Sequence, residues 1–380
     1  MAGSIFILAG EPSGDELAGR MMGAINAAYG QQNWVGVGGP SMQAQGLTSW
    51  TEMDQLAIIG FGAALRAYGR LSKLMDSIID QIMAERPRAV FTVDAKGFSL
   101  RLAARLRRRM AQQGWQAPII HTVAPTVWAW GAWRRHKVAK QVDRLLCLFP
   151  FEPDYFTPLG LDTRFIGHPE AFNPALEVQT EIKLGPSKNI VLLPGSRRSE
   201  VTHNLPTMLA ALAPVRAQHP GLRISLVTMP RLRGQIAQIL SGNGVSDVDV
   251  IEGPGSFVTV VGGADAVMAV SGTVTLQTAL LGAPGVTLYK ADAISAWIGR
   301  RLVAMENVIL PNAILGRPLY PFLFQEQATA KRLSLAMLAC LEDPHAKAMA
   351  CSGAQELRVL LKNNATSFDK LVASAVSDML

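Results

Sequence analysis

The chain of 380 residues repeats one pattern, in which a short apolar run typical of a buried strand precedes a segment with helical periodicity. Clear examples are residues 4–10 followed by 16–30, and residues 89–95 followed by 100–110. Strands that alternate with helices in this way are typical of βαβ units and of parallel sheets covered by helices. The pattern therefore predicts an α/β fold built from doubly wound sheets.

The pattern is interrupted over residues 170–188, which show no clear period and contain two prolines. We place a domain boundary there and predict Rossmann-like domains at 1–169 and 186–345. From residue 328 onward the sequence indicates only helices, which we expect to wrap or bridge rather than to add strands. Doubly wound sheets bind ligands at the carboxyl ends of their strands, so we expect a site in the crevice between the domains.

Composition excludes several classes of protein. No apolar run reaches the roughly 20 residues of a spanning helix, and the N-terminus lacks a basic leader, so we expect a cytoplasmic protein. Cys147, Cys340 and Cys351 lack metal-ligand spacing and no HExxH motif occurs, so we expect neither metal nor cofactor. The net charge of +7 indicates an anionic partner. Because no nucleic-acid motif is present, we expect an acidic membrane face or a phosphorylated substrate rather than nucleic acid.

A turn of small residues follows the first predicted strand and begins a helix. It contains Ser13, Gly14 and Asp15. Ser13 and Glu16 have the spacing of a capping box, and Gly14 would allow a ligand to approach the backbone. A plain strand-to-helix turn explains these residues equally well.

A second turn of this kind has the sequence LPGSRRSE at residues 193–200. The backbone N–H groups of Gly195 and Ser196, together with the guanidinium of Arg197, suit a diphosphate.

A third turn, at residues 271–277, places Ser271, Gly272 and Thr273 before or at the start of a predicted helix. Gln277 lies one turn inside that helix, where it could reach sugar or ribose hydroxyls. The alternative is that Ser271 or Thr273 is simply the N-cap residue.

Asp94 lies at the predicted carboxyl end of a buried strand, where parallel-sheet proteins place reactive groups. A carboxylate there can accept the proton of an attacking hydroxyl. The alternative is a structural aspartate that caps the following loop. His121 and His168 have similar strand-end positions and suit either a structural role or a hydrogen bond to a ligand.

Taken together, these motifs resemble the lipid-A-disaccharide synthase family over nearly the whole chain. Ten segments occur in the family's order: AGEPSGD, GVGGPSMQAQG, IIGF, VDAKGFSLRLA, VAPTVWAW, LCLFPFEPDYF, FIGHP, LLPGSRRSE, SGTVTLQ and ILPNAILGR. The resemblance implies a GT-B architecture, two Rossmann-like domains with a helical C-terminal extension. It also implies that residues 346–380 return to the N-terminal domain.

The resemblance implies an inverting, metal-independent hexosyltransferase. Its donor would be UDP-2,3-diacylglucosamine and its acceptor 2,3-diacylglucosamine 1-phosphate, giving a β-1,6-linked lipid A disaccharide 1-phosphate and UDP. Asp94 would be the base, Arg197 with Gly195 and Ser196 would hold the diphosphate, and residues 271–277 would hold the nucleotide. Residues 13–15 and Asn312 would face the acceptor or the reacting sugar.

Several positions depart from the family pattern. Gly97 stands where many members have a second aspartate, and Lys96 where many have proline. Gln277, Ala63 and Phe322 stand where glutamate is usual. These changes leave open a weak or silent glycolipid-binding paralogue, and a GT-B enzyme acting on another UDP-sugar is a further alternative.

Acylated substrates lie in a bilayer, so we expect a peripheral contact with the anionic cytoplasmic face of the inner membrane. Tryptophan and basic side chains suit that surface. One predicted patch comprises Trp133, Arg134, Arg135 and Lys137, and a second comprises Trp297, Arg300 and Arg301. We expect Trp128 and Trp130 to be buried instead. The oligomeric state, including a homodimer, stays open.

Overall fold

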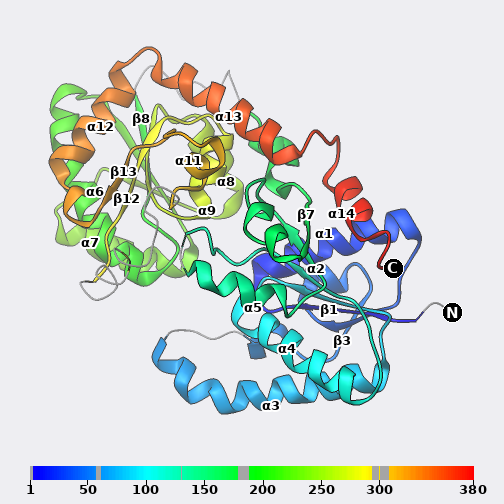
Figure 1. Cartoon of the computed structure of the whole chain (residues 1–380). Helices are drawn as coiled ribbons and strands as arrows, with labels where there is room; N and C mark the ends of the chain where they lie inside the picture. The colour runs from blue at the N-terminus through cyan, green and yellow to red at the C-terminus, as the bar shows by residue number, and fades with distance from the viewer. Residues whose placement is uncertain (1–2, 57–60, 130, 179–187, 293–298, 300–307) are drawn as a thin grey trace. The chain divides into compact units, whose positions relative to one another are not determined.

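The computed structural model describes residues 3–56, 61–129, 131–178, 188–292, 299 and 308–380. The chain divides into two compact units (Figure 1). Unit 1 comprises Met1–Phe172 and Leu361–Leu380, and unit 2 comprises Asn173–Leu360.

Unit 1 contains a seven-stranded parallel sheet with the strand order β3-β2-β1-β4-β5-β6-β7. The strands are β1 (Ile5–Ala9), β2 (Trp34–Val37), β3 (Leu47–Ser49), β4 (Ala89–Val93), β5 (Ile119–Thr122), β6 (Arg144–Cys147) and β7 (Asp162–Phe165). The helices are α1 (Pro12–Tyr29), α2 (Pro40–Gln43), α3 (Phe61–Glu85), α4 (Lys96–Gln112), α5 (Arg135–Ala139) and α14 (Phe368–Val376).

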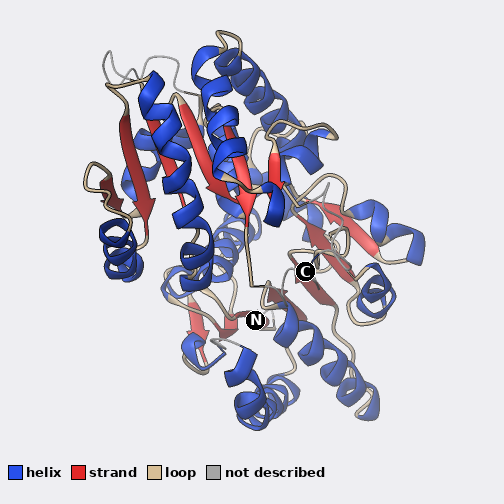
Figure 2. Cartoon of the chain, turned by 90° about the vertical axis from the view of Figure 1, so that its left-hand side faces the viewer, coloured by secondary structure: helices blue, strands red, loops and turns tan. Residues whose placement is uncertain are grey.

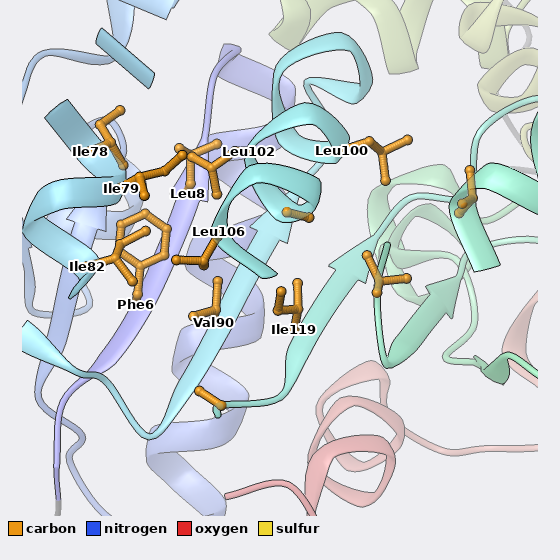
Figure 3. Packing of buried hydrophobic residues seen from close by; sticks show 14 of the residues in the cluster. Phe6, Leu8, Ile78, Ile79, Ile82, Val90, Leu100, Leu102, Leu106 and Ile119 are labelled. Carbon is orange, nitrogen blue, oxygen red and sulfur yellow. The ribbon is translucent and has the colours of Figure 1, made fainter. Parts of the chain in front are cut away.

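The central strands β1 and β4 are buried on both faces of this sheet, since their successive residues point to opposite sides and all are buried. Phe6 and Val90 belong to the core that also contains buried residues of α3 and α4, such as Ile79 and Leu106 (Figure 3). Ile5, Ile7 and Phe91 belong to the opposite core, which contains residues of α1 and α14. Burial on both faces explains why these strands read as continuous apolar runs.

Unit 2 contains a six-stranded parallel sheet with the order β10-β9-β8-β11-β12-β13. The strands are β8 (Asn189–Leu193), β9 (Arg223–Thr228), β10 (Asp249–Glu252), β11 (Ala266–Val270), β12 (Gly285–Tyr289) and β13 (Phe322–Phe324). The helices are α6 (Arg198–Gln218), α7 (Arg233–Gly242), α8 (Pro254–Gly262), α9 (Thr273–Leu280), α11 (Leu310–Leu315), α12 (Ala330–Glu342) and α13 (Ala346–Lys362). Figure 2 shows the strands of each unit running side by side between helices.

The predicted α/β fold with two doubly wound parallel sheets is confirmed. The chain returns to unit 1 at Leu361 rather than at residue 346. Most of α13 stays in unit 2 because Ala354 and Leu357 are buried and Arg358 donates to the carbonyl oxygen of Leu176. Among the helices that the structure describes, none combines the length and the hydrophobicity that spanning a bilayer requires.

Candidate functional site

The strand order of each sheet reverses at one position, between β1 and β4 in unit 1 and between β8 and β11 in unit 2. In doubly wound sheets such a switch point is where the loops diverge and ligands bind. Four of the sequence candidates follow these four strands: the loop at residues 10–15 follows β1, Asp94 follows β4, Gly195 follows β8 and Ser271 follows β11. The topology therefore brings two of these candidates to the switch point of each sheet.

The backbone at several of these strand ends adopts a conformation that side chains disfavour. Asp94 and Ala95 have φ of 49° and 43°, and Val123, just after β5, has φ of 75°. A β-branched residue at positive φ is a genuine outlier, and such strain gathers at functional sites. The loops after β4 and β5 are therefore candidates for function on backbone geometry alone.

Asp94 is half-buried at the carboxyl end of the central strand β4. Its backbone N–H donates to the carbonyl oxygen of Thr122 at 3.0 Å. The first turn of α1 lies against it. A Cβ atom added to Gly14 would be 3.7 Å from the Cβ of Asp94 and 3.4 Å from the carbonyl oxygen of Val93. These are ordinary contact distances, so the first turn of α1 lies directly beside Asp94.

Asp15 has a structural task that the sequence did not reveal. Its side chain is 3% exposed and accepts hydrogen bonds from the backbone N–H groups of Gly39 (2.8 Å), Ser41 (3.0 Å) and Met42 (3.2 Å). The carboxylate therefore satisfies the otherwise unpaired N–H groups at the start of α2. This differs from the expectation that Asp15 faces the acceptor.

The predicted capping box of Ser13 and Glu16 is wrong. Helix α1 begins at Pro12 with Glu11 as its N-cap residue, so Ser13 already lies inside the first turn. Pro at the first helical position explains the earlier start, because its fixed φ suits the helix and no N–H is lost there. Ser13 is exposed, whereas Gly14 is buried.

The loop after β8 is organised by Glu200. One carboxylate oxygen accepts from the backbone N–H groups of Ser196 (2.9 Å) and Arg197 (3.2 Å), and the other pairs with the Arg197 guanidinium at 2.9 Å. Gly195 has φ of 108°, and a Cβ atom there would be 2.5 Å from Glu200 Oε2. The N–H of Ser196, which we expected to face a diphosphate, is thus bound to Glu200, while Arg197 stays exposed.

Helix α9 begins at Thr273 with Gly272 as its N-cap residue. The alternative in which Ser271 or Thr273 is the N-cap is therefore wrong. The first turn is instead held by Thr275, whose hydroxyl donates to the carbonyl oxygen of Gly272 at 2.7 Å. Ser271 and Gln277 are half-buried and Thr273 is exposed.

Asn312, in α11, uses its side-chain amide within unit 2. Its oxygen accepts from the N–H groups of Leu319 (2.9 Å) and Tyr320 (3.0 Å), and its nitrogen donates to the carbonyl oxygen of Tyr320 at 2.8 Å. Asn312 therefore closes a loop, which differs from the expected position beside the acceptor.

The two strand-end histidines are held inside unit 1. His121 is buried and its Nδ1 lies 2.8 Å from the hydroxyl of Thr92. Burial, with a smaller effect from the positive charge of Arg20, lowers the pKa of His168 to about 4. Its Nδ1 accepts from the N–H of Glu170 at 3.3 Å. His168 is therefore neutral near pH 7.

Trp128 is 7% exposed, as predicted, and its ring centroid lies 6.4 Å from that of Phe149 and 5.2 Å from that of Phe151. Phe149 in turn stacks on His168 at 5.4 Å. These rings form a cluster after β5, β6 and β7. Trp130 lies outside the described residues.

The first predicted surface patch is exposed in part. Trp133 is 75% exposed and Lys137 is exposed, but Arg134 and Arg135 are half-buried, contrary to the prediction that both lie outside. The side chain of Arg134 folds back over Gly131. A Cβ atom at Gly131 would be only 2.9 Å from the Cδ of Arg134. The second patch, Trp297, Arg300 and Arg301, lies outside the described residues.

The sequence did not single out Glu200 or Arg231, whose guanidinium donates to the carbonyl oxygen of Ser196 at 3.0 Å. The spacing of Arg197 and Glu200, three residues apart at a helix start, was the available signal for Glu200. Arg231 lies after a different strand, so no local pattern marked it. Among the described side chains, no three histidine, cysteine, aspartate or glutamate residues group as metal ligands would.

Solved structures of similar fold cover nearly the whole chain. The UDP-GlcNAc 2-epimerase from Neisseria meningitidis, bound to UDP-GlcNAc, has a TM-score of 0.61 and 12% identity, covering 99% of this chain and 100% of that one. A glycosyltransferase from Rickettsia africae has a TM-score of 0.56 and 11% identity, covering 100% of this chain and 98% of that one. These likenesses confirm the GT-B fold.

The sequence model for lipid-A-disaccharide synthetase matches residues 5–376. The lipid-A-disaccharide synthase of Rhodospirillum centenum is 37% identical over 383 aligned residues, which cover 99% of this chain and 94% of the relative. That of Ruegeria pomeroyi is 33% identical, covering 90% of this chain and 88% of the relative. This chain belongs to the lipid-A-disaccharide synthase family, as the ten motifs predicted.

Proposed function

We propose that the chain catalyses the reaction for which its family is named, as an inverting glycosyltransferase. It transfers 2,3-diacylglucosamine from its UDP donor to 2,3-diacylglucosamine 1-phosphate, forming the β-1,6-linked lipid A disaccharide 1-phosphate and UDP. The observation that carries the proposal within the molecule is the position of two residues at the switch points of the sheets. Asp94 directly follows β4, and Arg197 is the N-cap residue of α6 in the loop after β8.

In this proposal Asp94 is the general base. Its carboxylate takes the proton of the acceptor 6-hydroxyl as that oxygen bonds to the anomeric carbon of the donor. The bond between the anomeric carbon and the diphosphate breaks, and its electron pair leaves with UDP. The Arg197 guanidinium stabilises the charge that develops on the leaving diphosphate, because it presents several donors in a fixed plane.

The remaining roles are assigned to residues of the loops after β11 and β1. Ser271, Gly272, Thr273 and Gln277 hold the nucleotide, and Ser13 with Gly14 lies on the acceptor side. Asp15 and Asn312 contribute indirectly, because their side chains hold backbone segments.

Replacement of Asp94 by asparagine tests the mechanism. Asparagine keeps the size of the side chain but cannot accept the proton, so we expect UDP release to fall by at least a factor of about 100. UDP release should be measured with purified protein and both lipid substrates. Asp76→Asn is the matched control, because Asp76 is a surface partner of Arg105. Unchanged turnover in Asp94→Asn would assign the base to another group.

A second candidate is a glycolipid-binding protein with little or no turnover, and Gln277 supports it. Glutamine at this half-buried position can bond to ribose hydroxyls but lacks the charge-assisted strength of the usual glutamate. Steady UDP release by the wild-type protein would exclude this candidate. If a soluble UDP-sugar serves as well as the acylated donor, the enzyme acts on another UDP-sugar instead.

We infer that the protein works at the cytoplasmic face of the inner membrane through a peripheral contact. Exposed Trp133 beside Lys137 supports this inference, since tryptophan suits the interface and cations suit acidic headgroups. A homodimer stays a prediction that the solution mass, measured by light scattering, would test.

A further inference from the structure

We propose that Glu200 positions Arg197 for the transfer reaction and acts on the rate through that arginine. This inference rests on the proposed function. The carboxylate of Glu200 joins the loop backbone, at the N–H groups of Ser196 and Arg197, to the Arg197 guanidinium. A single side chain thus connects the loop backbone to the exposed cation of Arg197.

The two partners differ sharply in exposure. The side chain of Glu200 is 10% exposed and that of Arg197 is 76% exposed. Arginine has one of the largest rotamer entropies of any side chain, so an exposed guanidinium without a partner would sample many positions. The contact with Glu200 uses one side of the guanidinium and leaves further N–H donors for a phosphate.

Glu200 and the loop before it are also held by neighbouring residues through close packing and backbone hydrogen bonds. Gly195 packs so closely that a Cβ atom there would be 2.6 Å from the Cβ of Glu200. Asn204 is fully buried and donates both to the carbonyl oxygen of Glu200 at 2.8 Å and to that of Lys290, after β12, at 3.1 Å. Arg231 holds the carbonyl oxygen of Ser196. Glu200, which contacts Arg197, is therefore linked through Asn204 to the segment after β12.

A competing explanation is that Glu200 merely caps the start of α6. The third helical position of a capping box accepts glutamine as well as glutamate, because either side chain offers an oxygen to backbone N–H groups. Glu200→Gln therefore keeps a cap but removes the charge-assisted contact with Arg197. This substitution separates a positioning role from a purely structural one.

In Glu200→Gln we expect kcat to fall about tenfold, because the guanidinium is no longer fixed where charge develops. The KM for the UDP donor should be unchanged or lower, since a negative charge beside the phosphate-binding cation is removed. The thermal unfolding midpoint should stay near that of the wild type. Glu356→Gln is the matched control, because it breaks an arginine–glutamate pair with Arg317 elsewhere in unit 2.

A double-mutant cycle tests whether the effect passes through Arg197. In an Arg197→Lys background, Glu200→Gln should lower kcat by less than a factor of about 3, because the planar guanidinium that it positions is absent. If Glu200→Gln lowers the unfolding midpoint, Glu200→Asp is the second variant: it keeps the charge on a shorter side chain and should also lose kcat without a rise in KM.

Wild-type kcat in folded Glu200→Gln would overturn the inference and leave Glu200 as a helix cap. An equal loss in the wild-type and Arg197→Lys backgrounds would also overturn it. Failure of the proposed function is distinguishable, because the wild-type protein itself would then release no UDP from the two lipid substrates.

Discussion

At the scale of single residues, Gly195 is a position in the candidate site that tolerates a side chain poorly. Its φ of 108° lies where only glycine is comfortable, and a Cβ atom would meet the Glu200 carboxylate at 2.5 Å. We expect Gly195→Ala to destabilise the protein by about 1–3 kcal/mol. The dissociation constant for UDP should also rise, because Arg197 would shift with Glu200.

Titration calorimetry with UDP and urea unfolding measure these two effects. Gly234→Ala is the control, because an added Cβ there meets open space on a helix of the same unit. Wild-type UDP affinity in Gly195→Ala would show that the loop adapts without disturbing Arg197.

His168 makes the stability of unit 1 depend on pH. Its folded pKa of about 4 is below the ordinary value of 6.5, so the unfolded chain binds a proton more readily. The stabilisation is complete above pH 6.5 and is lost as pH falls toward 4. Between pH 7 and pH 5 the loss is about 2 kcal/mol.

His168→Asn keeps a hydrogen-bond acceptor and removes the titrating ring. We expect the urea midpoint of this variant to fall less than that of the wild type between pH 7 and pH 5. The exposed His345, replaced by asparagine, provides the control. Parallel pH profiles for wild type and His168→Asn would contradict the assignment.

At the scale of elements, hydrogen bonds and ion pairs from a buried arginine hold α14 against the sheet of unit 1. Arg144, on β6, is 2% exposed and donates to Asp162 at 2.7 Å and to Asp378, just after α14, at 2.8 Å. Apolar residues of α14, Phe368, Val372 and Val376, lie in the core beside α1. Helix α14 thus packs beside α1 and contributes to the core on one face of the unit 1 sheet.

The hydrogen bonds from Arg144 lower the pKa of Asp378 to about 2. Because this value is below the ordinary 3.8, the contact stabilises the fold above pH 3.8 and is lost as pH falls toward 2. Asp378→Asn should cost about 1 kcal/mol at pH 7, a modest amount because the carboxylate is partly solvated. The urea midpoint of Asp378→Asn should approach that of the wild type as the pH is lowered from 3.8 toward 2. A constant difference would contradict the role of the charge.

At the scale of the whole molecule, a net charge of +7 favours an anionic surface, and the membrane contact that we propose includes the exposed Trp133 and Lys137. Replacing Arg134, Arg135 and Lys137 by serine should weaken binding to anionic liposomes by at least tenfold, since each cation near acidic headgroups contributes about 1 kcal/mol. Co-sedimentation with vesicles that contain phosphatidylglycerol measures this.

A charge-matched control separates the patch from net charge. Lys331, Arg332 and Lys370 are exposed elsewhere on the chain, and their replacement by serine removes the same three charges. Equal losses in both triple variants would show that net charge, and no particular surface, drives binding.

Much of the fold could be predicted because the central strands β1, β4, β8 and β11 are buried on both faces. Runs such as residues 5–9 and 190–193 must then be apolar throughout, and the helices between them must carry apolar faces. Parallel order follows from the helical crossovers, and the switch points place Asp94 and Gly195 at strand ends. The family was predicted from the order of ten motifs along the chain. Hydrophobic periodicity and turn residues alone do not identify a family.

The sequence by itself determined the two parallel sheets and the polar residues at their carboxyl ends, because periodicity and strand burial are local properties. The tertiary structure alone decided which of those polar groups have a task inside the fold. Asp15 accepts from N–H groups 24 to 27 positions away in the sequence. Arg231, which follows β9, donates to Ser196, which follows β8. Such pairings depend on distances between loops, which periodicity does not encode.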